Sequence, residues 1–258
     1  MGKLKDKVAI ITGGADGIGL AISQRFAREG AKVAMIDIQE KKCREEARSI
    51  QAQGGEAHAI TCDVGNSDEV SSAVEQTIGH FGKIDILCNN AAIAIGITIT
   101  EMAEDDWNKV INTNLSSVYR GCKFVIPYMQ KGEGGSIINI ASAAAHVGLD
   151  TFTAYTAAKG AIISMTRQLA KEFAPQNIRV NSISPGTINT EMNAKLITKP
   201  GGENLMKSWI GMHPMNRIGD PDEVAGVASF LGSDDSSFVT GAELMVDGGL
   251  TTNPRFIE

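Results

Sequence analysis

The feature that most constrains the fold of this chain is a regular alternation of short apolar runs with longer amphipathic stretches. The apolar runs are nearly continuous and rich in Val and Ile, as in strands that are buried on both faces. We expect strands at residues 8–12, 32–36, 58–62, 84–88, 136–141, 179–183 and 243–246. We expect helices at residues 18–29, 39–53, 67–80, 103–130, 153–173 and 221–231. Strands that alternate with helices form a parallel sheet with helices on both faces, so the sequence predicts an α/β, doubly wound fold of about seven strands.

Length and composition fit a single domain over residues 1–258. Hydrophobic residues make up 43% of the chain, which is enough for a large core. The net charge is −6 and Lys and Arg do not cluster, which argues against nucleic acid and an anionic membrane as partners. The N-terminal apolar run is too short for a signal peptide, and no run approaches the roughly 20 apolar residues of a membrane span. We therefore expect a cytoplasmic protein.

The cysteines and histidines lack the spacing of a metal site. The four Cys residues show no CxxC pattern, and in a reducing compartment we expect free, mostly buried thiols. The four His residues are equally scattered, so we expect no catalytic metal.

A glycine-rich loop lies between the first strand and the first helix. It reads TGGADGIG at residues 12–19, and its glycines allow a sharp turn and a close approach of the backbone to a pyrophosphate. The helix that follows offers free N–H groups and the positive end of its dipole. We expect a dinucleotide site here, and a purely structural turn is the alternative. The candidate cofactor-binding residues of the loop are Gly13, Asp16, Gly17, Ile18 and Gly19.

An acidic residue, Asp37, closes the second strand, 18 residues after Gly19. A carboxylate at this place accepts hydrogen bonds from the adenosine ribose and repels a 2′-phosphate. Asp16 adds to that repulsion, and the residue after Asp37 is Ile38 rather than an Arg. We therefore expect NAD(H) rather than NADP(H) as the cofactor. The alternative is that Asp37 only caps the following helix.

Tyr155 and Lys159 lie four positions apart in an expected helix, so they share one face, roughly 6 Å apart along the axis. A free Tyr has a pKa of about 10 and is a poor base at neutral pH. A nearby ammonium lowers that pKa toward the working range. Such a pair is common on helical surfaces, so it indicates catalysis only together with other polar residues at the same place. Ser142 ends the fifth strand, at the sheet edge where ligands bind.

Asn114, inside the stretch 103–130, and the sequence NNAA at 89–92 can reach the same edge. Together, the motifs resemble the short-chain dehydrogenase/reductase family, in its compact single-domain branch with a Rossmann-type fold. The resemblance spans about residues 6–250. Its motifs are TGGADGIG at 12–19, CDV at 62–64, NNAA at 89–92, NTNL at 112–115, Ser142, YTAAK at 155–159 and PGTINT at 185–190.

The resemblance implies a role for each of these residues. Tyr155 would be the general acid/base on the substrate oxygen, and Lys159 would lower its pKa and bind the nicotinamide ribose. Ser142 would hold the substrate oxygen, and Asn114 would anchor a water in a proton relay. The implied cofactor contacts are Asp63 and Val64 at the adenine, Asn89, Pro185 and Gly186 along the cofactor, and Ile188 and Thr190 at the carboxamide.

Two positions depart from the family pattern. Ala92 stands where the family has Gly, so the backbone there must accept a Cβ, and we expect a small packing change. Asp16 stands where many relatives have Ser, Arg or Lys, which supports NAD and weakens pyrophosphate binding slightly.

These features predict an NAD(H)-dependent oxidoreductase that moves a hydride between nicotinamide and a secondary alcohol or ketone. Residues 187–219 have a weak regular pattern, which is typical of a substrate lid. With residues 93–98 and 143–152 they form a mostly apolar set, which favours a neutral cyclic or aromatic alcohol, a polyol or a sugar. The polar residues that can bind hydroxyls or an acid, or simply be solvated lid surface, are His146, Asn189, Asn193, Lys195, Lys199 and Lys207.

Three other functions are alternatives. A 3-oxoacyl-type ketoreductase is disfavoured by Asp37, since that role usually draws on NADPH. A nucleotide-sugar epimerase needs a larger C-terminal domain, and a catalytically inactive NAD(H)-binding sensor or scaffold usually lacks the Tyr or the Lys. The resemblance also implies a homotetramer of two-fold symmetry, built on residues 103–130 and 153–173 and on the last helix and strand.

Overall fold

A sheet in which every neighbouring pair of strands is parallel forms the centre of the computed structural model, which describes residues 2–198 and 202–252. Within those residues the sheet has seven strands: β1 Val8–Thr12, β2 Lys32–Asp37, β3 Glu56–Thr61, β4 Ile86–Asn89, β5 Gly135–Ile140, β6 Ile178–Pro185 and β7 Glu243–Val246. Their order is β3-β2-β1-β4-β5-β6-β7, so the winding reverses between β1 and β4. In such folds ligands bind at this reversal, beyond the carboxyl ends of the strands.

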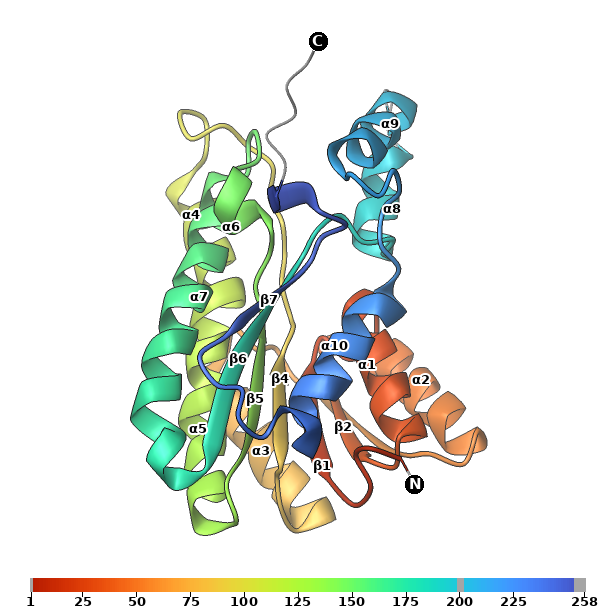
Figure 1. The fold of residues 1–258 in the computed structure, drawn as a ribbon, viewed down its shortest axis with the longest axis vertical. Helices are drawn as coiled ribbons and strands as arrows, with labels where there is room; N and C mark the ends of the chain where they lie inside the picture. The colour runs from red at the N-terminus through yellow and green to blue at the C-terminus, as the bar shows by residue number, and fades with distance from the viewer. Residues whose placement is uncertain (1, 199–201, 253–258) are drawn as a thin grey trace.

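Helices cover both faces of the sheet (Figure 1). One layer holds α1 Gly17–Arg28, α2 Glu40–Ala52 and α10 Pro221–Gly232, and the other holds α3 Ser67–Phe81, α5 Ser117–Lys131 and α7 Thr153–Phe173. Each layer encloses its own apolar core. Phe26 is fully buried in the first core and Ile162 in the second. The predicted doubly wound α/β fold is therefore confirmed.

The observed ends of the helices agree best with the expected ends where the sequence carries a capping signal. Asp220 and Glu223 form a capping box at the start of α10. Gly30, with φ at +93°, follows the C-cap of α1 in the left-handed conformation that ends many helices. Strands carry no such signals, and their observed starts differ from the expected ones. β3 begins two residues earlier than expected, and β4 begins two residues later.

The helix expected at 103–130 is interrupted. It consists of α4 Glu104–Ile111, a π-helical turn at Asn112–Ser116, and α5. A π turn accommodates one extra residue, and such turns are frequent at functional sites. Both halves bury apolar residues, so the amphipathic pattern alone does not reveal the insertion. The turn holds Asn114, which is fully buried.

The segment 187–219 contains two helices that its weak pattern does not predict, α8 Glu191–Ile197 and α9 Gly202–Met212. They lie beyond the strand ends, at the upper right of Figure 1. The two ends of the segment meet, because Gly219 N donates to Thr187 O at 2.9 Å and Asn189 N donates to Gly219 O at 2.8 Å. We call this contact the neck. Lys199 and residues 253–258 lie outside the described residues.

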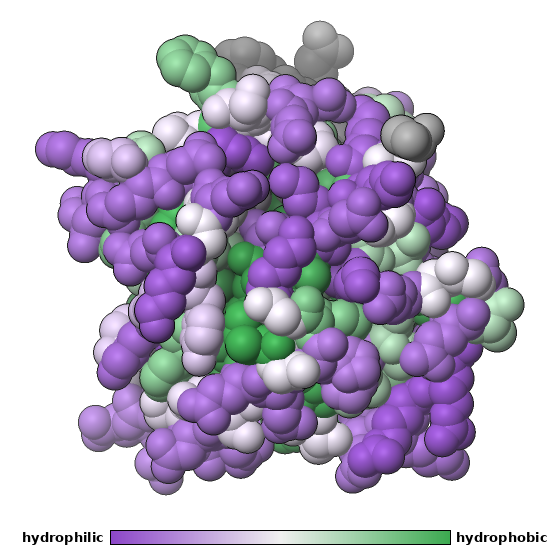
Figure 2. All heavy atoms as spheres, turned by 90° about the horizontal axis from the view of Figure 1, so that it is seen from below, coloured by the Kyte–Doolittle hydropathy of each residue, from purple (hydrophilic) through white to green (hydrophobic). Residues whose placement is uncertain are grey.

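The face seen from below in Figure 2 is mostly hydrophilic, with apolar side chains visible in its central part. In the described part of the chain, no helix combines the length and apolarity needed to cross a membrane. All four cysteines are free and buried, as expected. Burial raises the pKa of Cys88 to about 12, so its thiolate is scarce at neutral pH.

Candidate active site

The glycine-rich loop joins β1 to α1 at the reversal of the sheet. Gly13, with φ at +64°, and Gly17, at +49°, adopt left-handed conformations that side chains disfavour. A Cβ on Gly19 would lie 2.0 Å from the carbonyl oxygen of Gly13. The missing side chains therefore let the loop fold tightly onto the first turn of α1, whose N–H groups and dipole favour a phosphate.

Asp16 caps α1 and also takes part in an ion-pair chain. Its carboxylate accepts from Gly17 N at 2.6 Å and lies 3.0 Å from Lys42 Nζ of α2. The same ammonium lies 2.7 Å from Glu191 at the start of α8. Hydrogen bonds from Lys42 and then Lys195 lower the pKa of Glu191 to about 2. Lys42 thus offsets part of the charge of Asp16, and the expectation that Asp16 strengthens the repulsion of a 2′-phosphate stays a prediction.

Asp37 lies at the end of β2 and is only 6% exposed. One carboxylate oxygen accepts from Ala15 N at 3.1 Å and the other from Gln39 N at 2.9 Å. The carboxylate thus links the glycine-rich loop to the start of α2. Because each oxygen has a second lone pair, capping the chain before α2 does not exclude a ribose contact.

Asp63 and Val64 follow β3, next to the strand end that carries Asp37. Asp63 is exposed, and its Oδ1 accepts from Gly65 N at 2.8 Å. Its own N–H donates to Glu69 at 2.8 Å. Val64 is 7% exposed. The structure therefore brings both residues to the same edge of the sheet as Asp37.

The two asparagines after β4 point in different directions. Asn89 is 4% exposed, and its Nδ2 donates to Asn139 Oδ1 at 2.9 Å in the core. Asn90 Nδ2 donates instead to the carbonyl oxygens of Thr12 at 2.9 Å and Gly13 at 3.2 Å. The Asn89 side chain is therefore directed into the core, and Asn90 is the one that braces the loop. That Asn89 lies along the cofactor stays a prediction.

Asn114 fixes the chain that leaves β4. Its Oδ1 accepts from Ile93 N and its Nδ2 donates to Ile93 O, both at 2.8 Å. Ala92 sits just before this clamp. The non-glycine residues with positive φ in the described ranges are Asp6, Thr151, Asn177 and Asn216. Ala92 is not among them, so its backbone is not in the left-handed conformation and accepts the Cβ without strain.

Ser142, Tyr155 and Lys159 come together beyond the carboxyl end of β5. Lys159 is 2% exposed, its Nζ donates to Ile140 O at 2.7 Å, and it lies 5.5 Å from the centre of the Tyr155 ring. Burial lowers the pKa of Lys159 to about 8. Burial also raises the pKa of Tyr155, and a hydrogen bond with Ser142 acts in the opposite direction. Burial is therefore the main influence on the Tyr155 pKa in this structure, and its expected lowering by Lys159 stays a prediction.

Residues 185–190 run from the end of β6 along the same edge. Pro185 O accepts from Ala143 N at 2.9 Å, which joins this stretch to the loop after β5. A Cβ on Gly17 would lie 3.2 Å from Thr190 Cγ2, so Thr190 stands against the glycine-rich loop. The other cofactor candidates of this stretch are Gly186 and Ile188.

Several polar residues expected near the substrate are engaged within the protein. His146 of α6 Ala144–Val147 lies 2.6 Å from Glu243. Asn193 Nδ2 donates to a backbone carbonyl at 2.8 Å, and Lys195 lies 3.0 Å from Glu191. The exposed large apolar side chains of the expected substrate segments are Val147, Leu149, Met192 and Met215. The apolar substrate surface stays a prediction.

Two residues of this site are not predicted from the sequence, Asn90 and Lys42. Asn90 belongs to the quoted NNAA motif, but the motif does not show which amide faces the loop. Lys42 is one of several charged residues on α2, so it does not stand out. Within residues 2–198 and 202–252, no three His, Cys, Asp or Glu side chains group as a metal site.

Known proteins resemble the chain over nearly its whole length. Residues 13–251 match the family model described as Enoyl-(Acyl carrier protein) reductase. The chain is 43% identical over 248 residues to the 3-oxoacyl-(acyl-carrier-protein) reductase FabG of Chlamydia pneumoniae, covering 96% of this chain and 98% of the relative. It is 38% identical over 253 residues to a cyclopentanol dehydrogenase of Comamonas sp., covering 98% and 100%.

Two solved structures share the fold. The aldohexose dehydrogenase of Thermoplasma acidophilum aligns with a TM-score of 0.90 at 36% identity and covers 100% of this chain and 98% of its own. A Burkholderia xenovorans protein described as a short-chain dehydrogenase/reductase aligns with a TM-score of 0.95 at 35% identity, covering 99% and 100%. With the motifs and the sheet order, these matches show that the chain belongs to the short-chain dehydrogenase/reductase family of oxidoreductases.

Proposed function

We propose that the protein is an NAD(H)-dependent enzyme that exchanges a hydride between nicotinamide and a secondary alcohol or ketone. The observation that carries the proposal is the grouping of Ser142, Tyr155 and Lys159 at the edge that also holds the glycine-rich loop. The relatives named above include a cyclopentanol dehydrogenase and an aldohexose dehydrogenase. A cyclic secondary alcohol or a sugar is therefore our preferred substrate class.

The residues present fit a nicotinamide dinucleotide. The tight loop without side chains at Gly13, Gly17 and Gly19 would hold the pyrophosphate. Asp37 would hold the adenosine ribose, and Ile188 and Thr190 would contact the nicotinamide end. When bound, the nicotinamide supplies or takes up the hydride, and the protein supplies orientation and charge.

The preference for NAD(H) rests on Asp37. Two backbone N–H groups hold its carboxylate in place, so the charge cannot swing away from a 2′-phosphate. A fixed negative charge in a partly buried position repels a phosphate more than one in bulk water does.

Proton transfer falls to Tyr155. In ketone reduction its hydroxyl donates a proton to the substrate oxygen, while the Ser142 hydroxyl donates a hydrogen bond to the same atom. Burial favours the neutral phenol, which is the form that reduction requires. In oxidation the phenolate accepts the alcohol proton, and the Lys159 ammonium stabilises it across the 5.5 Å to the ring.

A 3-oxoacyl-type ketoreductase is a second candidate, favoured by the 43% identity to a reductase of that name. It would use the same four residues, Asn114, Ser142, Tyr155 and Lys159, on a different substrate. An NAD(H)-binding sensor or scaffold without catalysis is the candidate of another class, and cofactor binding without turnover would favour it.

The test is a cofactor and substrate panel. The protein is mixed with NAD⁺ or NADP⁺ and secondary alcohols, polyols or sugars, and with NADH or NADPH and a 3-oxoacyl thioester, and the absorbance of the reduced cofactor is followed. We expect turnover with NAD⁺. Tyr155→Phe should lower turnover about 10²–10⁴-fold with NADH binding preserved, whereas the control Tyr119→Phe, outside the candidate site, should not. Turnover retained in Tyr155→Phe refutes the assignment, and turnover confined to NADPH and the thioester selects the second candidate.

A further inference from the structure

His213 is a buried polar residue whose two ring nitrogens are both engaged. It follows α9 and is 1% exposed. Its Nδ1 lies 2.6 Å from Trp209 O, and Thr187 N donates to its Nε2 at 3.1 Å. The imidazole thus joins the end of α9 to the first residue of the segment 187–219, next to the neck.

These partners define the protonation state of the ring. A carbonyl oxygen only accepts, so the proton is on Nδ1, and a backbone N–H only donates, so Nε2 must be free of a proton. The neutral tautomer satisfies both contacts. An imidazolium has no acceptor, so protonation would break the bond from Thr187.

The surrounding backbone is shaped to admit the ring. A Cβ on Gly186 would lie 2.7 Å from Nε2, so the imidazole reaches Thr187 only because Gly186 lacks a side chain. A Cβ on Gly248 would lie 3.6 Å from the ring Cδ2, at ordinary contact distance. Ring and glycine together fix the path of the chain as it leaves β6.

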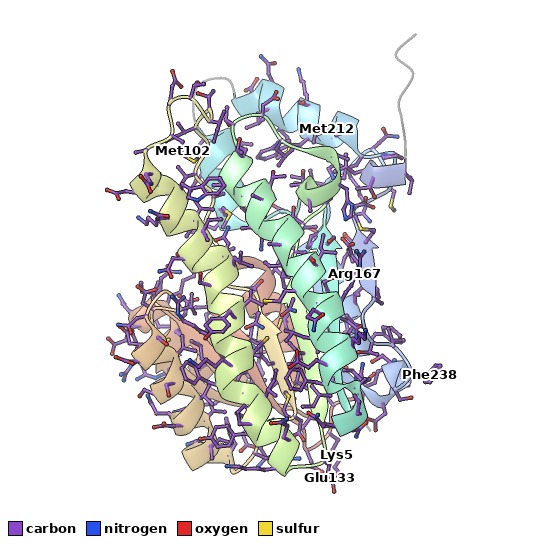
Figure 3. The ribbon with its side chains drawn as sticks, turned by 90° about the vertical axis from the view of Figure 1, so that its left-hand side faces the viewer. Lys5, Met102, Glu133, Arg167, Met212 and Phe238 are labelled. Carbon is purple, nitrogen blue, oxygen red and sulfur yellow. The ribbon has the colours of Figure 1, made fainter. Side chains whose placement is uncertain are left out.

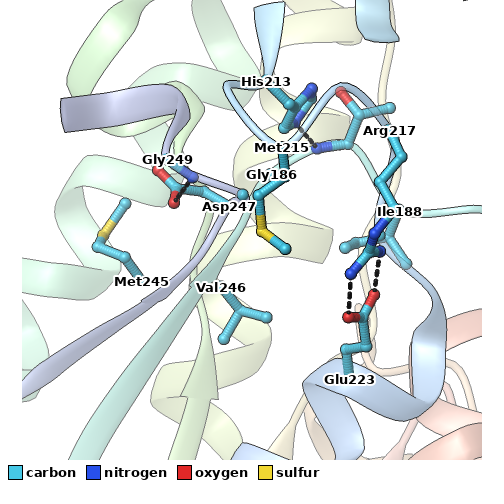
Figure 4. A pocket seen from close by; sticks show the side chains of 13 residues that line it. Gly186, Ile188, His213, Met215, Arg217, Glu223, Met245, Val246, Asp247 and Gly249 are labelled. Carbon is cyan, nitrogen blue, oxygen red and sulfur yellow. Dashed lines mark hydrogen bonds and ion pairs between the residues drawn. The ribbon is translucent and has the colours of Figure 1, made fainter. Parts of the chain in front are cut away.

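The charged groups around the ring are all engaged with other partners. His213 lines a cavity of about 330 Å³ together with Asp247, Arg217 and Glu223 (Figure 4). Asp247 accepts from Gly249 N at 3.0 Å and from Thr251 Oγ1 at 2.6 Å. Arg217 makes two hydrogen bonds of 2.7 Å to Glu223. Because each of these groups has hydrogen-bond partners other than the ring, the bonds to Trp209 and Thr187 define the role of the ring.

The peptide that His213 holds lies beside the candidate cofactor site. Thr187 precedes Ile188, which is 3% exposed and pairs with Gly219 across the neck. Two residues further on, Thr190 stands against the glycine-rich loop. A change in the Thr187 peptide would therefore shift the stretch that we assign to the nicotinamide end.

We propose that neutral His213 is a positioning residue that holds the Thr187–Ile188 backbone in the conformation that binds the nicotinamide end of the cofactor. The inference rests on the proposed function, since it assigns a determinant of cofactor affinity to that site. His213 itself is not assigned a contact with substrate or cofactor.

The test compares two substitutions of the same residue. His213→Gln keeps an acceptor at about the reach of Nε2, whereas His213→Asn keeps a polar group near Nδ1 and loses that acceptor. In the cofactor-free protein, hydrogen exchange of the Thr187 amide should be about ten-fold faster in His213→Asn and near wild type in His213→Gln. The Kd for NADH should follow the same order. Ser236→Ala, which removes a buried hydrogen bond to Leu231 O elsewhere, controls for general destabilisation.

Rescue by the Gln variant separates positioning from a structural role. A general loss of packing at His213 would affect both variants alike, whereas loss of the acceptor for Thr187 N affects His213→Asn alone. Equal exchange rates and affinities in the Asn and Gln variants would refute the inference while leaving the proposed function intact. A wild-type protein that binds no NAD(H) would overturn both.

Discussion

Asp37 combines two tasks in one carboxylate, since it braces the glycine-rich loop and places a fixed charge at the ribose end of the candidate site. Asp37→Asn removes the charge and keeps one of the two acceptor oxygens, so one of the bonds from Ala15 N and Gln39 N is lost with it. We expect kcat/KM for NADP⁺ relative to NAD⁺ to rise about ten-fold, equivalent to about 1.4 kcal/mol. The measurement is the ratio of initial rates with the two cofactors at subsaturating concentration.

The exposed Asp68 of α3 provides the control for this prediction. Asp68→Asn changes the net charge equally and lies outside the candidate cofactor contacts. An equal rise of the NADP⁺ ratio in both variants would show that net charge, and not the position of Asp37, determines the preference.

Lys159 connects catalysis to stability. Its pKa is about 8 in the folded protein, against 10.5 for an unburied lysine, because burial disfavours the ammonium. The unfolded chain therefore holds more protons between these values, and stability rises with pH across that window. Relative to Lys159→Met, the wild-type free energy of unfolding should increase by about 3 kcal/mol from pH 7.5 to pH 10.5.

Urea denaturation of both proteins at several pH values measures this difference. Other groups that titrate in the window affect both proteins alike and cancel. Parallel stability curves would show that the Lys159 ammonium is not disfavoured by burial.

Among the secondary-structure elements, α8 is connected to the cofactor loop through charges. Lys42 of α2 lies between Asp16 of the loop and Glu191 of α8, and all three side chains are about one-third to one-half exposed. Lys42→Met should raise the rate of NADH dissociation about three- to ten-fold, because α8 loses its link to the loop. Stopped-flow displacement of NADH measures this rate.

Salt and a neighbouring lysine control for this effect. Added salt should accelerate dissociation from wild type more than from Lys42→Met, since it screens partly exposed ion pairs. Lys41→Met is the matched variant, because Lys41 is 91% exposed and lies 3.9 Å from Glu45 on its own helix. Equal rates in the two variants would contradict the proposed link.

The same elements show what a sequence can and cannot predict. The Tyr155–Lys159 pair follows from the helical period, and the place of Ser142 follows from the parallel sheet, because both depend only on regular geometry. The π turn at Asn112–Ser116 does not follow, since one inserted residue leaves both amphipathic halves intact. The side chains of Asn89 and Asn90 point in different directions because one contacts Asn139 and the other contacts the glycine-rich loop. Both partners are distant in sequence, so the direction of each side chain could not be predicted.

At the scale of the whole molecule, we expect a homotetramer of two-fold symmetry. Helices α5 and α7 lie side by side on the face shown in Figure 3, and Phe238 projects from the edge of the molecule. Tyr119 of α5 is 52% exposed, and Phe238 before β7 is fully exposed. A second copy would remove this apolar surface from water. Light scattering should give about four times the 27.3 kDa mass of the chain, and a monomeric mass would refute the expectation.

The neck makes the segment 187–219 an insertion that leaves and re-enters the domain at adjacent points, since Ile188 pairs with Gly219. All seven strands of the described sheet lie outside the stretch between those points. In evolutionary terms, substrate range can then be inherited as a cassette, exchanged by recombination while the hydride-transfer residues stay in place. Grafting the matching cassette of a relative between Thr187 and Gly219 should therefore carry that relative's substrate range with it.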